Sequence, residues 1–299
     1  TKRWEFTVPG EAYGAPIINL DGTIHWPTYD KFYAVNPDGT KYWEFPSVEV
    51  EGAAIGADGT IYVTTYIGEG NSRVRSLCGF NPDGTLEWAS PASGSRLLVG
   101  LDETIYGCGG QLEASDAQGF PLWQTISGNS GEGVVSSDGT IYVLSSDGTG
   151  SGKGLIMAFG MNGGLKWQLG LPTEVFLSPA LLPDGTMYVG GGKRLYAVKV
   201  PCGMANSPWP MSGHDLKRTG RAGTGQPVCP CLSAIRLAGN RGFQLSMVGE
   251  IGTRYRIETS TNLIAWSPWT GFVASNLVTH LADPGATNLS YRFYRAVSP

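Results

Sequence analysis

The stretch Asp58-Gly59-Thr60-Ile61-Tyr62-Val63 and the later stretch Gly79-Phe80-Asn81-Pro82-Asp83-Gly84-Thr85-Leu86-Glu87-Trp88 form one unit that recurs along two thirds of the chain. Copies of the first stretch are spaced by 37, 44, 36 and 46 residues and begin at Asp21, Asp58, Asp102, Asp138 and Asp184. The second stretch reduces to small-x-polar-x-x-Gly-x-x-x-Trp and ends at Trp43, Trp88, Trp123 and Trp167. A repeat of this length with one Trp per copy is typical of propeller blades.

Each copy predicts two hairpins, because Asp-Gly between short β-branched or aromatic runs supplies the positive φ of a tight turn. In the second copy we expect strands over 52–57, 60–65, 74–81 and 85–89. The sequence therefore predicts an all-β fold, with a five-bladed β-propeller of four-stranded antiparallel blades over residues 1–200. Large rings at a fixed blade position are expected to pack between blades, and they are Trp4, Trp43, Trp88, Trp123 and Trp167.

The second phrase resembles the repeat of quinoprotein-type (PQQ-like) propellers, a group that includes the propeller lipoprotein of the bacterial outer-membrane assembly machinery. The resemblance covers about residues 1–200. It implies the fold and says little about activity, since many members of this group are non-catalytic. Family dehydrogenases carry more blades and a pair of adjacent cysteines, whereas this chain has five copies and no Cys-Cys pair, so no cofactor is expected.

The fifth copy lacks the strand that ends in Trp and meets Pro201-Cys202 instead. The chain opens with Thr1-Lys2-Arg3-Trp4-Glu5-Phe6, which aligns with residues 40–45 and matches an outer strand. We predict that this N-terminal strand closes the ring as the outer strand of the fifth blade. The alternative is strand addition to a neighbouring copy, which would give a polymer.

Residues 201–230 are expected to form a connector that packs on the propeller. Its Trp-Pro-Met-x-x-His-Asp phrase, which starts at Trp209, resembles a segment that accompanies such propellers in secreted bacterial proteins. His214 beside Asp215 invites a catalytic interpretation, because His titrates near neutrality. We favour His214 as an anchor that packs the segment, since adjacent loop residues rarely orient each other.

Residues 231–299 alternate apolar and polar side chains with period two, which predicts a small β-sandwich that folds independently. The phrase at 255–266, together with Arg292-Phe293-Tyr294-Arg295, resembles accessory modules at the C-termini of large exported bacterial proteins. The resemblance implies a role in attachment, spacing or assembly and brings no chemistry with it.

The composition narrows the classes of partner. Charged residues make up 15% of the 299 residues and the net charge is −4, so nucleic acid is not an expected partner. No apolar run is long enough to span a membrane. The five cysteines lack His partners at zinc spacing, so no metal is expected. Cys202 either pairs with Cys229 or Cys231, or stays unpaired.

The loops between the second and third strands of each blade share one face with the connections between blades, while both turns lie on the other. The turn face is expected to be structural and the variable face to carry function. The candidate ligand residues on the variable face are Glu11, Glu51, Glu69, Arg73, Glu132, Lys153 and Glu174. A solvated acidic rim is favoured over a cation site, because the acids stand at unequal distances from their turns.

The sequence favours a non-enzymatic extracellular or cell-surface protein for binding or assembly, in a secreted, cell-surface or periplasmic location. The expected partner is a protein or glycan at the cell surface, or another copy of the chain. The alternative is a carbohydrate-active lyase or hydrolase, since two carboxylates placed by the fold suffice for glycoside cleavage. A quinone-dependent dehydrogenase is a weaker alternative.

Overall fold

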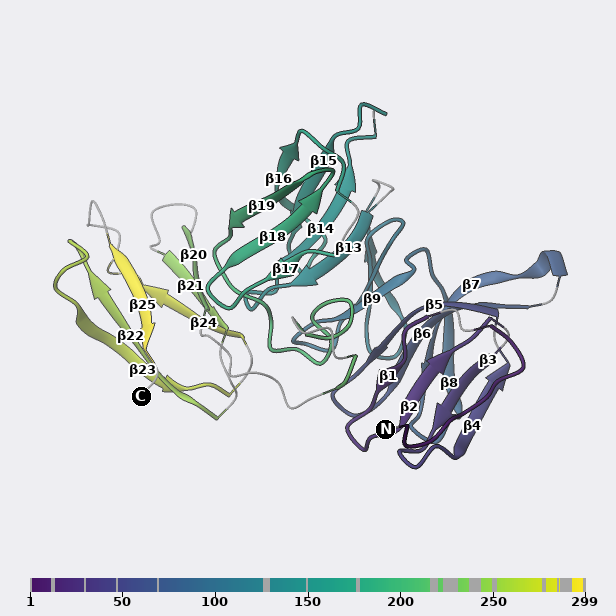
Figure 1. Cartoon of the computed structure of the whole chain (residues 1–299). Coiled ribbons are helices and arrows are strands. Elements are labelled where there is room, and N and C mark those ends of the chain that lie inside the picture. Colours follow the sequence, from purple (N-terminus) through teal and green to yellow (C-terminus); the bar gives the residue numbers. More distant parts are fainter. Residues whose placement is uncertain are drawn as a thin grey trace. The chain divides into compact units, whose positions relative to one another are not determined.

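The chain divides into two compact units, Thr1–Gly225 and Gln226–Pro299, each taken by itself below. The computed structural model describes residues 2–11, 14–29, 31–46, 48–68, 70–125, 130–148, 150–175, 178–215, 220–222, 231–236, 243–248, 252–275, 278–283, 285 and 292–297. Its strands are labelled in Figure 1.

In the first unit the five repeat copies fold as antiparallel sheets, which we call blades 1 to 5. Blades 1 and 2 consist of β1 (Ile17–Ile18), β2 (Ile24–Pro27), β3 (Lys31–Val35) and β4 (Lys41–Pro46), then β5 (Val48–Ile55), β6 (Ile61–Ile67), β7 (Val74–Phe80) and β8 (Leu86–Pro91). Blades 3 and 4 consist of β9 (Arg96–Val99), β10 (Ile105–Cys108), β11 (Glu113–Ser115) and β12 (Pro121–Gln124), then β13 (Ser130–Val135), β14 (Ile141–Ser146), β15 (Gly154–Phe159) and β16 (Leu165–Leu171). Blade 5 has three strands, β17 (Ala180–Leu181), β18 (Thr186–Gly191) and β19 (Arg194–Lys199). The all-β prediction is confirmed, and the described helical structure is one short 3₁₀ turn, η1 (Gly70–Ser72).

The Asp-Gly turns form as the sequence predicts. Gly59 and Gly84 have φ values of 88° and 89°, in the left-handed region that favours glycine. The carboxylate of Asp58 accepts a hydrogen bond of 2.9 Å from the N–H of Thr60, and the same contact recurs in the other copies. In the degraded third copy, Glu103 adopts φ 62° in place of glycine. The turn acids therefore serve the backbone of their own turns.

Each four-stranded blade repeats one packing unit. An aromatic residue on the second strand and a small residue on the third strand pack against the Trp of the outer strand. In blade 2, Tyr62 pairs with Gly79, which in turn pairs with Trp88. The ring centroids of Tyr62 and Trp88 lie 6.1 Å apart. The same register gives Tyr106, Ala114 and Trp123 in blade 3, Tyr142, Ala158 and Trp167 in blade 4, and His25, Ala34 and Trp43 in blade 1.

The other side of each of the first three Trp rings faces the glycine turn of the following blade. A Cβ added to Gly84 of blade 2 would lie 2.6 Å from the ring of Trp43, and one added to Gly119 of blade 3 would lie 2.4 Å from Trp88. The indole N–H of Trp43 donates a hydrogen bond of 3.0 Å to the carbonyl of Pro82, also in the next blade. The Trp and the Gly of the repeat are therefore partners across the blade interface.

The predicted pairing of the N-terminal strand with blade 5 is not found. Residues 2–8 form no strand, and β19 is the last strand of its three-stranded sheet within the described residues. Trp4 instead contacts blade 1, where its indole N–H donates to the carbonyl of Pro37 at 3.0 Å and its ring covers Gly39. Trp4 thus makes the contact to the following blade that its alignment with the repeat predicts. The strand that should hold Trp4 in blade 5 is not formed.

His25 takes the place of the blade tyrosine in blade 1. It is fully buried, and neither ring nitrogen has a hydrogen-bond partner among the described residues. Its ring lies 5.4 Å from that of Trp43. Burial lowers the pKa of His25 from 6.5 to about 4, and nearby Asp21 opposes this shift. The smaller ring fits because blade 1 has Asn19 where blade 2 has Gly56, and a Cβ at Gly56 would lie only 3.2 Å from the Tyr62 ring.

The second unit is a β-sandwich of two three-stranded sheets with one core. Its sheets have the orders β20-β21-β24 and β23-β22-β25. The strands are β20 (Cys231–Arg236), β21 (Phe243–Val248), β22 (Arg254–Ser260), β23 (Ser267–Val273), β24 (Val278–Asp283) and β25 (Phe293–Val297). Met247, Tyr255 and Ile257 form the buried centre of the core. On β25, Tyr294 donates a hydrogen bond of 2.8 Å to the buried carboxylate of Asp283 on β24, which ties the two sheets together.

We predict that Asp58→Ala lowers the free energy of unfolding by about 1 kcal/mol, because the Thr60 N–H loses its charged acceptor while the turn stays in place. Urea unfolding followed by tryptophan fluorescence measures the change. Glu87→Ala, which removes an exposed acid from β8, is the matched control. Equal stability of the Asp58 variant and the control would contradict the structural role of the turn acid.

We predict that the neutral form of His25 makes the first unit lose stability in acid. The unfolded chain takes up this proton near pH 6.5 and the folded chain only near pH 4. The stability that comes from keeping His25 neutral is therefore fully present above pH 6.5 and is lost as the pH falls to about 4. Linkage gives a loss of about 2 kcal/mol between pH 7 and pH 4.5.

The measurement is the difference in unfolding free energy between pH 7 and pH 4.5, compared for wild type and His25→Leu. Leucine removes the titrating group, so the variant should lose less stability over this interval. An equal pH dependence of the two proteins would rule out His25 as the source.

Candidate binding site

A cavity of about 620 Å³ opens among the starts of the inner strands of blades 1, 2 and 3. Its walls come from residues 14–17, from 50–53 on β5 and from 95–97 at β9. The rest of its lining comes from Pro27 on β2 and from the segment 203–222, described over 203–215 and 220–222, which contributes Trp209, Ser212, Gly213 and Gly220. The inner strands start where the chain enters from the preceding blade. The cavity therefore lies on the variable face, which the sequence predicts to carry function.

The segment 203–222 is held by hydrogen bonds to inner strands. The N–H of Val99 on β9 donates to the carbonyl of Trp209 at 2.8 Å, and the N–H of Val135 on β13 donates to that of Pro210 at 2.8 Å. On β1, the N–H of Ile18 donates to the carbonyl of Gly220 at 2.6 Å. Trp209 is 1% exposed, so the described part of this segment forms a packed floor.

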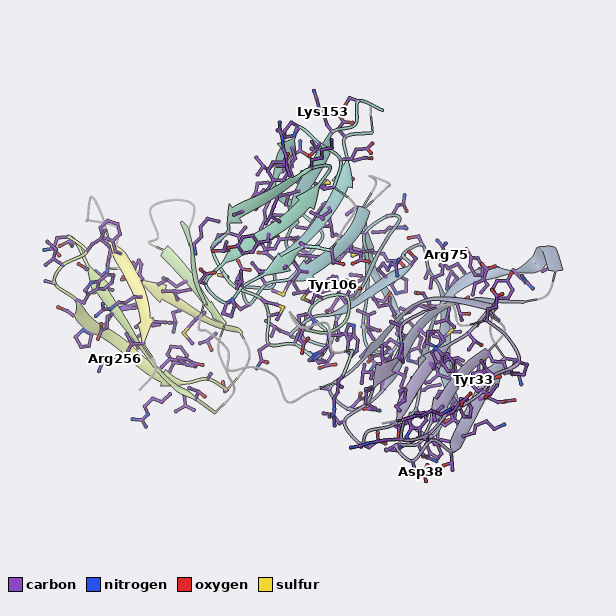
Figure 2. All side chains as sticks on the ribbon, in the orientation of Figure 1. Tyr33, Asp38, Arg75, Tyr106, Lys153 and Arg256 are labelled. Atoms are coloured by element: carbon purple, nitrogen blue, oxygen red, sulfur yellow. The ribbon has the colours of Figure 1, made fainter. Side chains whose placement is uncertain are left out.

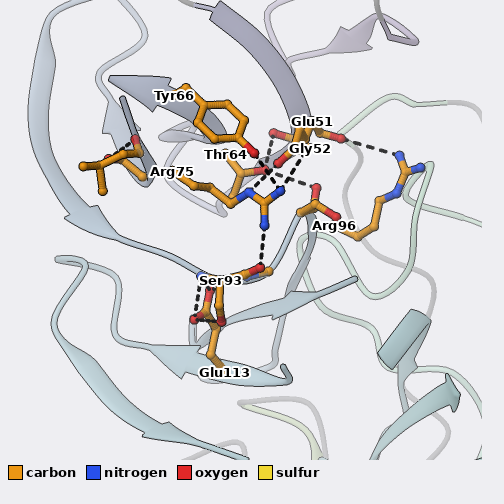
Figure 3. A network of polar contacts seen from close by, with 12 residues as sticks. Glu51, Gly52, Thr64, Tyr66, Arg75, Ser93, Arg96 and Glu113 are labelled. Carbon is orange, nitrogen blue, oxygen red and sulfur yellow. Dashed lines mark hydrogen bonds and ion pairs between the residues drawn. The ribbon is translucent and has the colours of Figure 1, made fainter. Parts of the chain in front are cut away.

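One wall of the cavity is organised by Arg75, whose guanidinium contacts three groups (Figure 3). It meets the carboxylate of Glu51 through Nε at 2.7 Å and Nη2 at 3.0 Å. It also donates to the hydroxyl of Tyr66 at 2.9 Å and to the carbonyl of Ser93 at 3.0 Å. Arg75 thereby fixes β5 of blade 2 to the connection that leads into blade 3.

The same connection is held from the other side by Glu113 on β11. Its carboxylate accepts hydrogen bonds of 3.0 Å and 2.9 Å from the N–H groups of Ser93 and Gly94, and one of 2.7 Å from the Ser93 hydroxyl. Residues 93 and 94 are therefore clamped between Arg75 and Glu113, and the neighbouring cavity wall at 95–97 is fixed in position.

Arg96 stands at the rim of the cavity with its side chain 51% exposed. Its Nε lies 3.7 Å from a carboxylate oxygen of Glu132 on β13, and its Nη1 lies 3.5 Å from the carbonyl of Glu51. Glu51, Arg75 and Arg96 thus each have a side chain of opposite charge within 4 Å, and Glu113 is bonded to the N–H groups and the hydroxyl of residues 93 and 94.

His214 packs on the floor of the cavity as an anchor. Its ring meets that of Trp209 edge-on, with centroids 5.2 Å apart, and burial lowers its pKa. Its Nδ1 lies 3.9 Å from the carboxylate of Asp215, beyond hydrogen-bond distance. The backbone φ of 73° fixes this turn. The geometry does not support the catalytic interpretation of this pair.

The seven candidate ligand residues have different outcomes. Glu51 lines the cavity, and Glu132 reaches it through Arg96. Glu69 lies outside the described residues. The other four are exposed and none of them lines the cavity; they are Glu11, Arg73, Lys153 and Glu174. Figure 2 shows Lys153 near the tip of a long loop.

Sequence reasoning missed Arg75, Arg96 and Glu113, which lie on blade strands that looked purely structural. One signal was present, since Arg75 and Glu113 place a charge at a strand start near the variable face. Among the described residues, no group of three or more His, Cys, Asp or Glu side chains is placed to hold a metal ion. No described helix has the length and apolar character that crossing a membrane requires.

Cys202 is disulfide-bonded, whereas Cys78 and Cys108 are free and buried. Of the two partners that the sequence suggested, Cys229 and the side chain of Cys231 lie outside the described residues. Burial raises the pKa of the Cys78 thiol to about 12, so this cysteine is an inert part of the core.

No protein-family model and no curated protein sequence matches the chain. Its fold is similar to that of a protein of unknown function from Bacteroides caccae, with 13% identity over 67% of this chain and 84% of the other, at a TM-score of 0.45. It is also similar to a gluconolactonase from Xanthomonas campestris, with 14% identity, coverage of 80% and 84%, and a TM-score of 0.43. A third similar structure is the WD40 domain of Neurospora crassa Pan2, with 9% identity, coverage of 83% and 75%, and a TM-score of 0.43. At these values the similarities carry no argument about function.

We predict that Arg75→Met lowers the free energy of unfolding by about 2 kcal/mol, because Glu51 and the Ser93 carbonyl both lose a charged donor in a partly buried site. Glu51→Gln should remove part of the cost in the double variant, since the carboxylate is then no longer left unpaired. Urea unfolding of the two single variants and the double variant measures this coupling. Strictly additive effects would show that the pair contributes no mutual stabilisation.

Proposed function

We propose that this is a non-enzymatic extracellular or cell-surface protein that binds a neutral, hydroxyl-rich ligand, such as an oligosaccharide, in the cavity between blades 1, 2 and 3. The observation that carries the proposal is the internal pairing of the charges in the wall, Glu51 with Arg75 and Arg96 with Glu132. Because the charges of this wall are already paired, the wall can recognise a ligand through its shape and through hydrogen bonds with neutral groups.

The groups left for a ligand fit this class. The lining supplies the hydroxyls of Ser95 and Ser212 and the backbone of several glycines, above an apolar base that includes Ile17 and Leu97. The wall is also fixed by the contacts of Arg75 and Glu113, so binding would cost little ordering of the protein.

The alternative of glycoside cleavage has less support. Cleavage by two carboxylates needs a second acid facing the first across the ligand. Among the described residues that line the cavity, Glu51 is the one carboxylate, and Arg75 holds both of its oxygens. This arrangement favours binding without turnover.

The proposed location outside the cytoplasm is supported by the disulfide bond of Cys202, because such bonds form and persist in oxidising compartments. The low content of charged side chains agrees with this setting.

The test is a printed array of neutral oligosaccharides probed with the full chain, with a reducing-end assay on each bound sugar. Ala15→Trp places a large ring at the exposed rim of the cavity and should weaken binding at least about 10-fold. Gln118→Trp adds the same ring to the turn face and should bind as wild type does, as should Asp58→Ala. Equal binding by the Ala15 variant, or release of reducing ends, would overturn the proposal.

A further inference from the structure

Blade 5 has the aromatic residue and the small residue of the repeated packing unit, but within the described residues it lacks the outer strand that would supply the Trp. Tyr188 on β18 pairs with Ala197 on β19, in the register that the other blades use. Tyr188 is 39% exposed, whereas its three tyrosine equivalents are each 1% exposed; these are Tyr62, Tyr106 and Tyr142. Ala197 is likewise exposed, although its equivalents Ala34, Ala114 and Ala158 are buried.

Trp4 carries the other half of the same unit. It makes the contacts that a repeat Trp makes to the following blade, with Gly39 under its ring and the carbonyl of Pro37 on its N–H. It is nevertheless 39% exposed, while Trp43 and Trp88 are half-buried, because residues 2–8 belong to no described sheet. The exposed side of Trp4 corresponds to the side that Tyr62 and Gly79 cover in Trp88.

The two halves complete each other. Within the described residues, blade 5 has an exposed Tyr-Ala pair and an unpaired strand edge, and residues 2–8 have the Trp and a backbone that belongs to no sheet. The outer edge of β19 pairs with no further described strand, so it can accept a strand as β3, β7, β11 and β15 do in their blades. The register of the repeat places Trp opposite the small residue, as Trp43 lies opposite Ala34. Applied to blade 5, it places Trp4 opposite Ala197, Glu5 opposite Tyr196 and Phe6 opposite Leu195, which is 72% exposed.

We propose that residues 2–8 of one copy add to β19 of a second copy as its fourth strand, with Trp4 seated on Tyr188 and Ala197. A second copy is the partner because, in the described part of one chain, residues 2–8 and β19 are not paired with each other and both Trp4 and Tyr188 stay exposed. The two surfaces differ, so the contact is heterologous and produces rings or filaments according to the rotation between copies. The cavity plays no part in this contact.

The test is the mass of the full chain in solution, measured by light scattering over a range of concentrations. Wild type should associate as concentration rises, and Trp4→Ala should weaken association about 30-fold or more, as expected of a central aromatic anchor. Ala197→Glu should do the same from the other surface, and this exposed position leaves the core intact. Phe120→Ser, which removes an apolar side chain that is 67% exposed in blade 3, is the control and should associate like wild type.

Mixing the two disabled variants decides whether the surfaces differ. Trp4→Ala retains blade 5 and Ala197→Glu retains Trp4, so each should fail to assemble alone while the mixture forms a one-to-one dimer. Wild type that stays monomeric at all concentrations, or a mixture that does not pair, would overturn the proposal. Ala15→Trp should assemble normally, so failure of the binding proposal would be seen separately.

Covalent trapping checks the register. Glu5→Cys combined with Tyr196→Cys should give a ladder of linked copies on oxidation, since directly opposite residues on paired strands lie within disulfide reach. Glu5→Cys with Arg194→Cys is two positions out of register and should link poorly. A link formed within one chain, which is the signature of ring closure, or no link at all, would overturn the proposal.

Discussion

The repeat Trp of blades 1 to 3 is held from two sheets at once, and the rest of the first unit depends on this contact. Its ring needs a small residue under it in its own blade and a glycine turn against it in the next. A Cβ at Gly79 would lie 2.4 Å from the ring of Trp88, and one at Gly84 would lie 2.6 Å from that of Trp43. The indole N–H groups of Trp43 and Trp123 each donate to a carbonyl of the neighbouring blade, so packing these rings between blades leaves their donors paired. Blade spacing, turn type and side-chain size are therefore fixed together.

The fold of the first unit was predictable because its signals are local and repeated. An Asp followed by Gly makes the same turn in each copy, and the spacing from small residue to Trp is set by strand register alone. The predicted closure of the ring is not found, and the reason is the same. The phrase around Trp4 matches the repeat, but a local match cannot tell whether the other strands of its blade are present beside it.

The candidate site was predictable only in part, because it is built from the parts of the chain that do not repeat. Glu51 and Glu132 were found because the sequence placed them in the connections between blades, and the structure has them on the inner strands β5 and β13 that follow those connections. Arg75 and Glu113 sit on blade strands, and their role depends on residues 93 and 94 passing between them. That path is set by the packing of three segments far apart in sequence, and no spacing within one segment encodes it.

The place of the cavity follows from the hydrogen bonds of the segment 203–222. Inner strands of propeller blades turn an unpaired edge toward the centre, and this segment bonds to the inner strands of blades 1, 3 and 4 through residues such as Ile18, Val99 and Val135. Among the described residues it forms no bridge to β5 of blade 2. Residues 50–53 of β5 line the cavity instead. The segment thus fills the space beside each inner strand with which it pairs. The cavity is the space left beside β5, and there a ligand can meet backbone groups of the inner strand.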